Sequence, residues 1–363
     1  MKLAKLELYR IFINNKGILL VLLSLLLKVA TLAVIPELKD DRIKLSQRQY
    51  NVYMDDLYGT DNDEKQLFIA TEYNTAKTLV EKFGEMSAAY DHGEITEAEW
   101  SEFYALQDYY AIRLPALSIL YEKLTDFQQI ESYEGIERPA YFYDYGWRTV
   151  FTYLAIPDIL CILSAAVLAV QVFGNDIAHG SVNLLRTTKN GRKRLFTFRV
   201  SFCALSAAAV ALVHTAAEIL MFALRMPLND IAEPLYSLPH FAGLPIPISI
   251  QTGLIALYAF RVFGVVCVTL LALALTIFLR GIVNTLASTL TLILLPILLR
   301  GTMPPSVVPY THTGFLIGED VMRNYTFLPN ALYWVLPACA LLAITLALLW
   351  TAGWAFRKSA FPD

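Results

Sequence analysis

The chain has 363 residues, of which 56 % are hydrophobic and 17 % are charged, and its mean hydropathy is +0.49. Soluble proteins carry roughly 25 % charged residues, so this composition excludes a disordered chain, a coiled coil and a nucleic-acid-binding domain. The net charge of −3 hides two opposite parts, because residues 37–148 hold 11 basic and 23 acidic residues whereas basic residues predominate elsewhere. The sequence predicts an acidic insert within a membrane protein.

The amino-terminal segment, residues 1–16, is basic and places Leu6, Tyr9 and Ile13 on one stripe of a helix. Such a pattern is typical of a helix that lies on the inner membrane surface. Residues 17–35 follow as transmembrane helix 1, since ~20 apolar residues cross ~30 Å of hydrocarbon. A cleaved signal peptide is the alternative, but the apolar run is longer than such peptides use.

The acidic insert, residues 36–148, is expected to form a helical extracellular domain between spans one and two. A short helix is expected over 38–57. Asp61–Glu64 matches a capping box, in which a short oxygen side chain at a helix start is answered by an acid three residues later. It predicts a second helix that continues to about Tyr90.

Thr96–Glu99 matches the same box and predicts a third helix from about Ile95 to Ile130, kinked at Pro115. Aromatic and aliphatic residues recur along it at helical spacing: Trp100, Phe103, Leu106, Tyr110, Leu114 and Leu117. Such a stripe is more often the core of a helical domain than a binding face, although outward-facing residues of the domain could bind a ligand.

Residues 149–363 are expected to hold transmembrane helices 2–6. The apolar runs are Thr149–Phe173, Phe196–Phe222, Gly253–Leu279, Ile282–Leu299 and Ala331–Phe356. The run Ile282–Leu299 is the weakest, because it is short and contains Pro296, and a re-entrant hairpin with the preceding run is its alternative.

Orientation follows from the short loops, because Lys and Arg accumulate on the cytoplasmic side of a membrane. The amino terminus, the segment after span two, the turn at Arg280 and the carboxyl tail together hold 13 basic residues, against three in the opposite loops. Both termini are therefore expected in the cytoplasm of a multi-pass cell-membrane protein, and the acidic insert is expected outside.

Signatures of catalysis are absent from the sequence. It contains no phosphate-binding loop, no zinc-binding helix of the H-E-x-x-H type and no G-x-S-x-G elbow. The five histidines are scattered and the four cysteines lie in apolar runs, so no metal site or disulfide framework is expected. The chain itself is expected to be non-catalytic and to bind no cofactor.

Residues 174–195 follow span two and combine an acid, a glycine four residues later, a short amphipathic stretch, a threonine pair and a Gly-Arg turn. The residues concerned are Asp176, Gly180, Leu184, Leu185, Thr187 and Arg192. This layout, together with six spans and an amphipathic amino-terminal helix, resembles the cytoplasmic coupling segment of ABC-2-type transporter permeases. An ordinary basic loop that obeys the inside-positive rule is the alternative.

The resemblance implies a bacterial exporter subunit whose coupling segment docks on a separate ABC ATPase. Leu184 and Leu185 would fill the groove of the ATPase, and Asp176 and Arg192 would set the register by charge pairing. ATP and magnesium would bind the ATPase, and a second permease chain, identical or different, would complete the pore. An amphipathic peptide or drug is the expected substrate.

Two features depart from the family pattern. Asp176 stands where relatives commonly have Glu, and the first external loop holds about 110 residues where many relatives have a short loop. The alternative function is a membrane sensor whose extracellular domain binds a ligand such as an antimicrobial peptide without transporting it. A channel is a weaker third interpretation, since no span repeats a polar face.

Five ionisable residues lie within the predicted spans: Lys28, Asp158, His214, Glu218 and Arg261. Charged residues within a membrane usually face protein or water, and all five map to the outer half. They could line a polar outer vestibule for substrate. The favoured interpretation is that Lys28 or Arg261 pairs with an acid to hold the spans together.

Overall fold

The computed structural model describes residues 2–37, 44–131, 133, 136–178, 191–279, 281–328 and 330–358. The chain divides into two units. The first comprises Met1–Ile35, Tyr153–Leu224 and Leu254–Asp363, and the second comprises Pro36–Thr152 and Arg225–Gly253. The apolar runs and the acidic insert therefore belong to different units.

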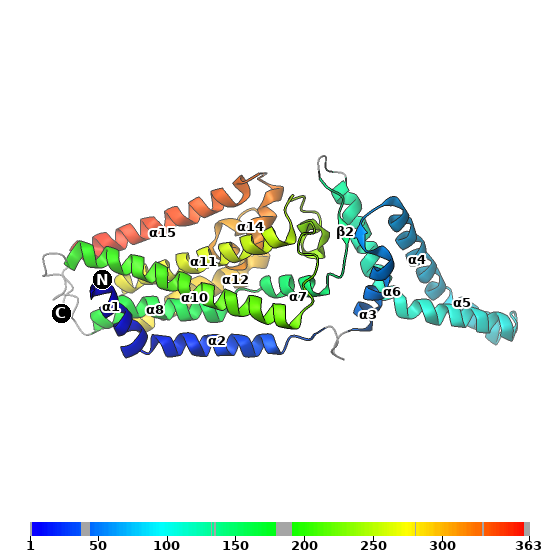
Figure 1. Cartoon of the computed structure of the whole chain (residues 1–363), viewed down its shortest axis with the longest axis horizontal. Helices are drawn as coiled ribbons and strands as arrows, with labels where there is room; N and C mark the ends of the chain where they lie inside the picture. The colour runs from blue at the N-terminus through cyan, green and yellow to red at the C-terminus, as the bar shows by residue number, and fades with distance from the viewer. Residues whose placement is uncertain are drawn as a thin grey trace. The chain divides into compact units, whose positions relative to one another are not determined.

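Long apolar helices dominate the first unit (Figure 1). They are α2 (Gly17–Ala33), α8 (Ile159–Ala178), α10 (Phe196–Arg225), α11 (Ile250–Leu279), α12 (Ile282–Leu299) and α15 (Leu332–Lys358). Among the described residues, five helices are long and apolar enough to cross a membrane, or six if the bent pair Lys5–Asn14 and Gly17–Ala33 forms one span. The chain is thus built as an all-α membrane protein with five or six candidate spans.

Span two is not the single uninterrupted helix that the run Thr149–Phe173 predicts. The structure has α7 (Tyr145–Leu154), a break of four residues, and then α8. Pro157 lies in the break, where it lacks a backbone N–H and disfavours helical geometry in the residue before it. Asp158 then caps α8, because its Oδ1 accepts a hydrogen bond of 3.0 Å from the backbone N–H of Cys161.

The amino-terminal segment is helical, as expected, but it contains a bend. It consists of α1 (Lys2–Leu8) and the π-helical turn η1 (Tyr9–Asn14), and it meets α2 at 58°. Lys16 permits the bend by adopting a left-handed conformation with φ of 55°. Leu6, Tyr9 and Ile13 are exposed, so the apolar stripe faces away from the rest of the chain.

Short helical turns connect α12 to α15. They are η5 (Arg300–Thr302), η6 (Val308–Tyr310), α13 (His312–Ile317), α14 (Glu319–Arg323) and η7 (Asn324–Thr326). The connection folds back onto the bundle, since Phe315 is fully buried and its ring centroid lies 5.0 Å from that of Phe263 on α11.

The second unit is mainly helical, as the sequence predicts. Its helices are α3 (Leu45–Leu57), α4 (Asp63–Glu81), α5 (Phe83–Asp91) and α6 (Glu97–Glu131), with the short turns η3 (Leu235–Ser237) and η4 (Pro239–Phe241). A two-residue antiparallel ladder, which the sequence did not predict, pairs β1 (Gly59–Thr60) with β2 (Ala140–Tyr141). Its core includes Tyr50, Met54, Ile69, Leu120 and Phe127.

The two predicted capping boxes have different outcomes. Thr96 and Glu99 cap α6 reciprocally, since the Thr96 N–H donates to Glu99 Oε2 at 2.8 Å and the Glu99 N–H donates to Thr96 Oγ1 at 3.3 Å. Asp61 is not the cap of α4, because that role belongs to Asn62, whose Oδ1 accepts from the Lys65 N–H at 2.9 Å. Asp61 is instead buried, and its N–H donates to the carbonyl of Pro139.

The second predicted helix of this unit is divided in the structure, whereas the third has about the predicted length. The predicted helix to Tyr90 is two helices, α4 and α5, separated at Lys82. The predicted third helix is continuous, and Pro115 lies inside it without dividing it. In Figure 1, α5 and the first part of α6 form an arm that extends from the three-helix core of the unit.

Candidate functional site

Helices α2, α10 and α11, together with the residue that caps α8, bring the five ionisable residues predicted within the spans into one largely buried cluster, the polar cluster (Lys28, Asp158, His214, Glu218 and Arg261). The Lys28 ammonium lies 2.5 Å from Asp158 Oδ2 and 2.5 Å from Glu218 Oε2. Arg261 Nη1 lies 3.4 Å from Glu218 Oε1, and His214 Nδ1 lies 3.3 Å from Asp158 Oδ2. These contacts agree with the pairing interpretation of the sequence.

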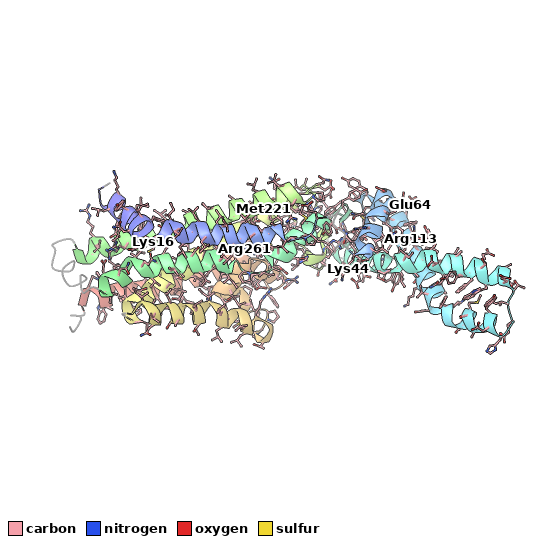
Figure 2. All side chains as sticks on the ribbon, turned by 90° about the horizontal axis from the view of Figure 1, so that it is seen from below. Lys16, Lys44, Glu64, Arg113, Met221 and Arg261 are labelled. Atoms are coloured by element: carbon pink, nitrogen blue, oxygen red, sulfur yellow. The ribbon has the colours of Figure 1, made fainter. Side chains whose placement is uncertain are left out.

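Helical spacing explains how the cluster is presented. His214 and Glu218 are four residues apart on α10 and therefore share one face, which is buried. On α2, Ser24 and Lys28 have the same spacing, and Ser24 Oγ lies 3.2 Å from His214 Nε2. In Figure 2, Lys16 lies near one end of the bundle and Arg261 lies farther along it.

The break between α7 and α8 contributes to the cluster in a way that sequence reasoning missed. Arg261 Nη2 donates hydrogen bonds to the carbonyl oxygens of Leu154 and Ile156, at 2.5 and 2.7 Å. A broken helix leaves such carbonyls without their helical partners. The only signal in the sequence was Pro157 preceding Asp158 within an apolar run.

The polar cluster is closed in this conformation. The cavity among its side chains has a volume of about 20 Å³, and a single water needs roughly 10–15 Å³. It therefore has no room for a substrate, and the outer vestibule, which was the alternative interpretation of these residues, is not open in this conformation. Removing one member of a buried ion pair typically costs about 3–5 kcal/mol, so the cluster has a clear structural role.

Asp158, Cys161 and His214 place ligand atoms within 4.8 Å of one another and could in principle hold a metal ion. Lys28 already lies against the Asp158 carboxylate, so a metal ion would have to compete with its ammonium group. Ion pairing with Lys28 and His214 accounts for the position of the Asp158 carboxylate.

A second charged cluster, the clasp (Glu7, Arg10, Asp176 and Arg199), joins the amino-terminal segment to α8 and α10. Arg10 Nη1 lies 3.0 Å from both oxygens of Asp176, and Arg199 Nη1 lies 2.6 Å from Asp176 Oδ2. Glu7 Oε1 accepts from Arg199 Nη2 at 3.0 Å, and Glu7 Oε2 lies 2.6 Å from Arg10 Nη2. The negative charges of the two carboxylates thus balance the positive charges of the two guanidinium groups.

The clasp places one predicted coupling residue, Asp176, in contact with arginines of its own chain. Its predicted contact with an ATPase stays a prediction. Gly180, Leu184, Leu185 and Thr187 lie outside the described residues. Arg192 belongs to the π-helical turn η2 (Gly191–Leu195), but the position of its side chain is not described. Sequence reasoning missed Glu7, Arg10 and Arg199 because each is an ordinary residue of a basic membrane flank.

The predicted aromatic stripe of α6 has two environments. Leu117 is fully buried in the core of the second unit, whereas Leu106 is 48 % exposed. In the arm, the Trp100 ring stacks on Tyr90 at 5.3 Å and lies 5.8 Å from both Phe83 and Tyr104.

Acidic residues flank this aromatic cluster of the arm along the sequence. Between positions 82 and 108 the sequence has one lysine and seven carboxylates. Helix α5 contains no buried residue, so these rings form a half-exposed surface rather than a core. An aromatic surface framed by negative charge suits a cationic, partly apolar ligand.

The core of the second unit contains a buried lysine. Lys123 Nζ lies 3.2 Å from Asp144 Oδ2 and 3.3 Å from the Tyr50 hydroxyl. Burial lowers the pKa of Lys123, and Asp144 opposes that shift by favouring the ammonium form. Burial also raises the pKa of Tyr50 well above its ordinary value, and the Asp144 charge adds to that shift. Contacts among Tyr50, Lys123 and Asp144 thus connect α3, α6 and the segment before α7.

Comparisons with known proteins identify no relative of this chain. No family model, curated protein or solved structure matches it. The resemblance to ABC-2-type permeases therefore depends on the layout of the sequence.

Proposed function

We propose that this chain is the transmembrane permease subunit of an ATP-binding cassette exporter, inactive alone and driven by separate ATPase subunits. The observation that carries the proposal is the clasp. It lies at the start of the segment 179–190, which connects α8 to α10 and contains most of the proposed ATPase-contacting residues.

The clasp suits the transmission of force. Hydrogen bonds between charged groups are short and strong, and this cluster joins three segments through two arginines and two acids. A displacement of the coupling segment would therefore move α8, α10 and the amino-terminal segment together. A flexible basic loop would not transmit motion in this way.

The proposed membrane arrangement follows the distribution of basic residues. The termini and the coupling segment face the cytoplasm, and the second unit is extracellular. The exposed stripe of Leu6, Tyr9 and Ile13 supports a placement of the amino-terminal segment against lipid, with the charged residues of the clasp directed inward. A second permease chain completes the transporter, and its identity to this chain is left open.

Copurification from the native membrane tests the proposal. The full chain is solubilised in mild detergent and captured, and an ABC ATPase is sought by mass spectrometry. We expect the ATPase with the wild type and its loss from Leu184→Glu, because an acid would disrupt an apolar contact. Leu106→Glu, the same change on the arm, is the matched control and should retain it. Absence of an ATPase from the intact wild-type preparation would refute the proposal.

A sensor that binds a ligand without transporting it is the second candidate. The half-exposed aromatic cluster of the arm favours it, because Trp100 and Tyr104 offer a binding surface remote in sequence from the spans. Reconstitution of the subunit with its ATPase in proteoliposomes separates the two. ATP-dependent accumulation of a cationic amphipathic peptide supports the exporter, whereas binding without accumulation supports the sensor.

A further inference from the structure

The first unit contains an apolar pocket of about 330 Å³ between three helices. Residues of α8 line it together with residues of α2 and α12, and both of these helices pack against α8. The pocket opens at the surface of the bundle, since Leu23, Leu27 and Leu290 line it and are all exposed. On membrane-spanning helices, that exposed side faces lipid.

One residue of this pocket points to a ligand. Thr289 is 1 % exposed and lines the pocket, yet its Oγ1 has no hydrogen-bond partner among the residues that the structure describes. Threonines at neighbouring positions of α12 donate to backbone carbonyls one turn earlier, as Thr285 does to Gly281 and Thr291 to Ala287. A buried hydroxyl without a partner is unfavourable because it has lost its hydrogen bonds to water, and an acceptor atom of a ligand would restore one.

The other two hydroxyl groups of the pocket already have partners. Ser164 donates to the carbonyl of Cys161, and Ser24 donates to that of Val21 and contacts His214 of the polar cluster. The pocket therefore has apolar walls, one hydroxyl that is not hydrogen-bonded, and the polar cluster beside one end. Because that cluster is closed, the pocket offers the space for a ligand that the cluster lacks.

We propose that this pocket binds a single acyl chain of an amphiphile that enters from the bilayer, with a carbonyl of the amphiphile accepting a hydrogen bond from Thr289. The volume lies at the lower limit of the ~300–1,000 Å³ typical of small-ligand sites, which favours one slender chain over a ring system. The lipid-facing opening sets the route of entry. That the amphiphile is cargo depends on the proposed export function, whereas its binding does not.

Photo-crosslinking tests the site without any ATPase. The purified full chain is placed in phosphatidylcholine nanodiscs with a monoacylglycerol that carries a diazirine midway along its acyl chain. Crosslinked peptides from α2, α8 and α12 are expected. Thr289→Val keeps the shape of the side chain but removes the hydroxyl. It should raise the probe concentration that gives half-maximal crosslinking about three- to tenfold. Thr291→Val, on the same helix but outside the pocket, should leave it unchanged.

A second variant tests the space itself. Val167→Trp fills the pocket and should abolish crosslinking there, with folding checked by thermal unfolding. The proposal would be overturned if the lipid-exposed faces of α10 and α15 were labelled as strongly as the pocket. It would also be overturned if Thr289→Val left the half-saturating probe concentration unchanged. Both outcomes can be read even if Val167→Trp fails to fold. If the pocket is crosslinked as expected but the chain captures no ATPase, the binding site is supported and only the export function is refuted.

Discussion

Arg10 and Asp176 are 166 positions apart in the sequence, yet one guanidinium nitrogen of Arg10 lies 3.0 Å from both carboxylate oxygens of Asp176. The same guanidinium group also donates to the carbonyl of Val172 at 2.9 Å. The amino-terminal segment is thereby bound to the end of α8, next to the segment that connects α8 to α10. A residue proposed to contact an ATPase is held in position by its own chain.

Asp176→Asn should destabilise the first unit, because Arg10 and Arg199 lose a shared counter-charge. Breaking a buried pair from one side costs about 3–5 kcal/mol, and the partial exposure of Arg10 places the expected loss at the lower end. Thermal unfolding of the full chain in detergent measures it. Asp108→Asn, an exposed change on α6, is the control, and equal melting temperatures for the two variants would contradict this role.

Lys28→Met should be strongly destabilising, whereas the double variant Lys28→Met with Asp158→Asn should lose less stability than the two single changes combined. The single change removes the ammonium group beside the Asp158 carboxylate and leaves it with His214 and the Cys161 N–H, and the second change removes that charge. A double-mutant cycle measures the interaction energy, which we expect at about 1–3 kcal/mol. Strict additivity would show that the two side chains do not interact.

The second unit should lose stability as the pH rises through about 10. Burial raises the pKa of Tyr53 and Tyr236 to about 12 each, and raises that of Tyr50 and Tyr141 as well. An unfolded tyrosine releases its proton near pH 10.0, so above that pH the unfolded state binds fewer protons than the folded state, which lowers the free energy of unfolding.

Lys123 acts in the opposite direction, because its pKa is lowered in the folded state and its contribution to stability rises with pH up to 10.5. Burial also lowers the pKa of Lys65 in the same unit, and the four buried tyrosines outnumber these two lysines. Tyrosinate absorbance and circular dichroism, followed together during an alkaline titration, should show late ionisation of the buried tyrosines coupled to loss of helix. Ionisation of every tyrosine near pH 10 with the helices intact would be inconsistent with this account.

Trp100→Ala on the arm should change binding without unfolding the domain. Trp100 is partly buried among the rings of the arm and lies outside the core of the unit, so we expect a stability loss of about 0.5–1.5 kcal/mol, the worth of an aromatic pair. Affinity for a fluorescein-labelled cationic amphipathic peptide, measured by anisotropy, should fall. Glu97→Lys with Glu102→Lys should weaken it further, and more so at low salt. Unchanged affinity in both variants would remove the arm as a binding surface.

The sequence alone determined the helical class, the separation of an acidic insert from apolar runs, and one helix cap. These features are local, since apolar run length and capping pairs depend on residues within a few positions of one another. It also identified Lys28, Asp158, His214, Glu218 and Arg261 as residues that need partners, because charge within an apolar run is costly.

Only the tertiary structure decided which partners these residues take. Helical periodicity shows that His214 and Glu218 share a face, but not that Lys28 of α2 lies between Glu218 and Asp158. The break at Pro157 directs two carbonyls toward Arg261 of a distant helix, and Asp176 turns to arginines more than twenty positions away. Such contacts depend on how helices are placed around one another, and helix periodicity carries no information about that placement.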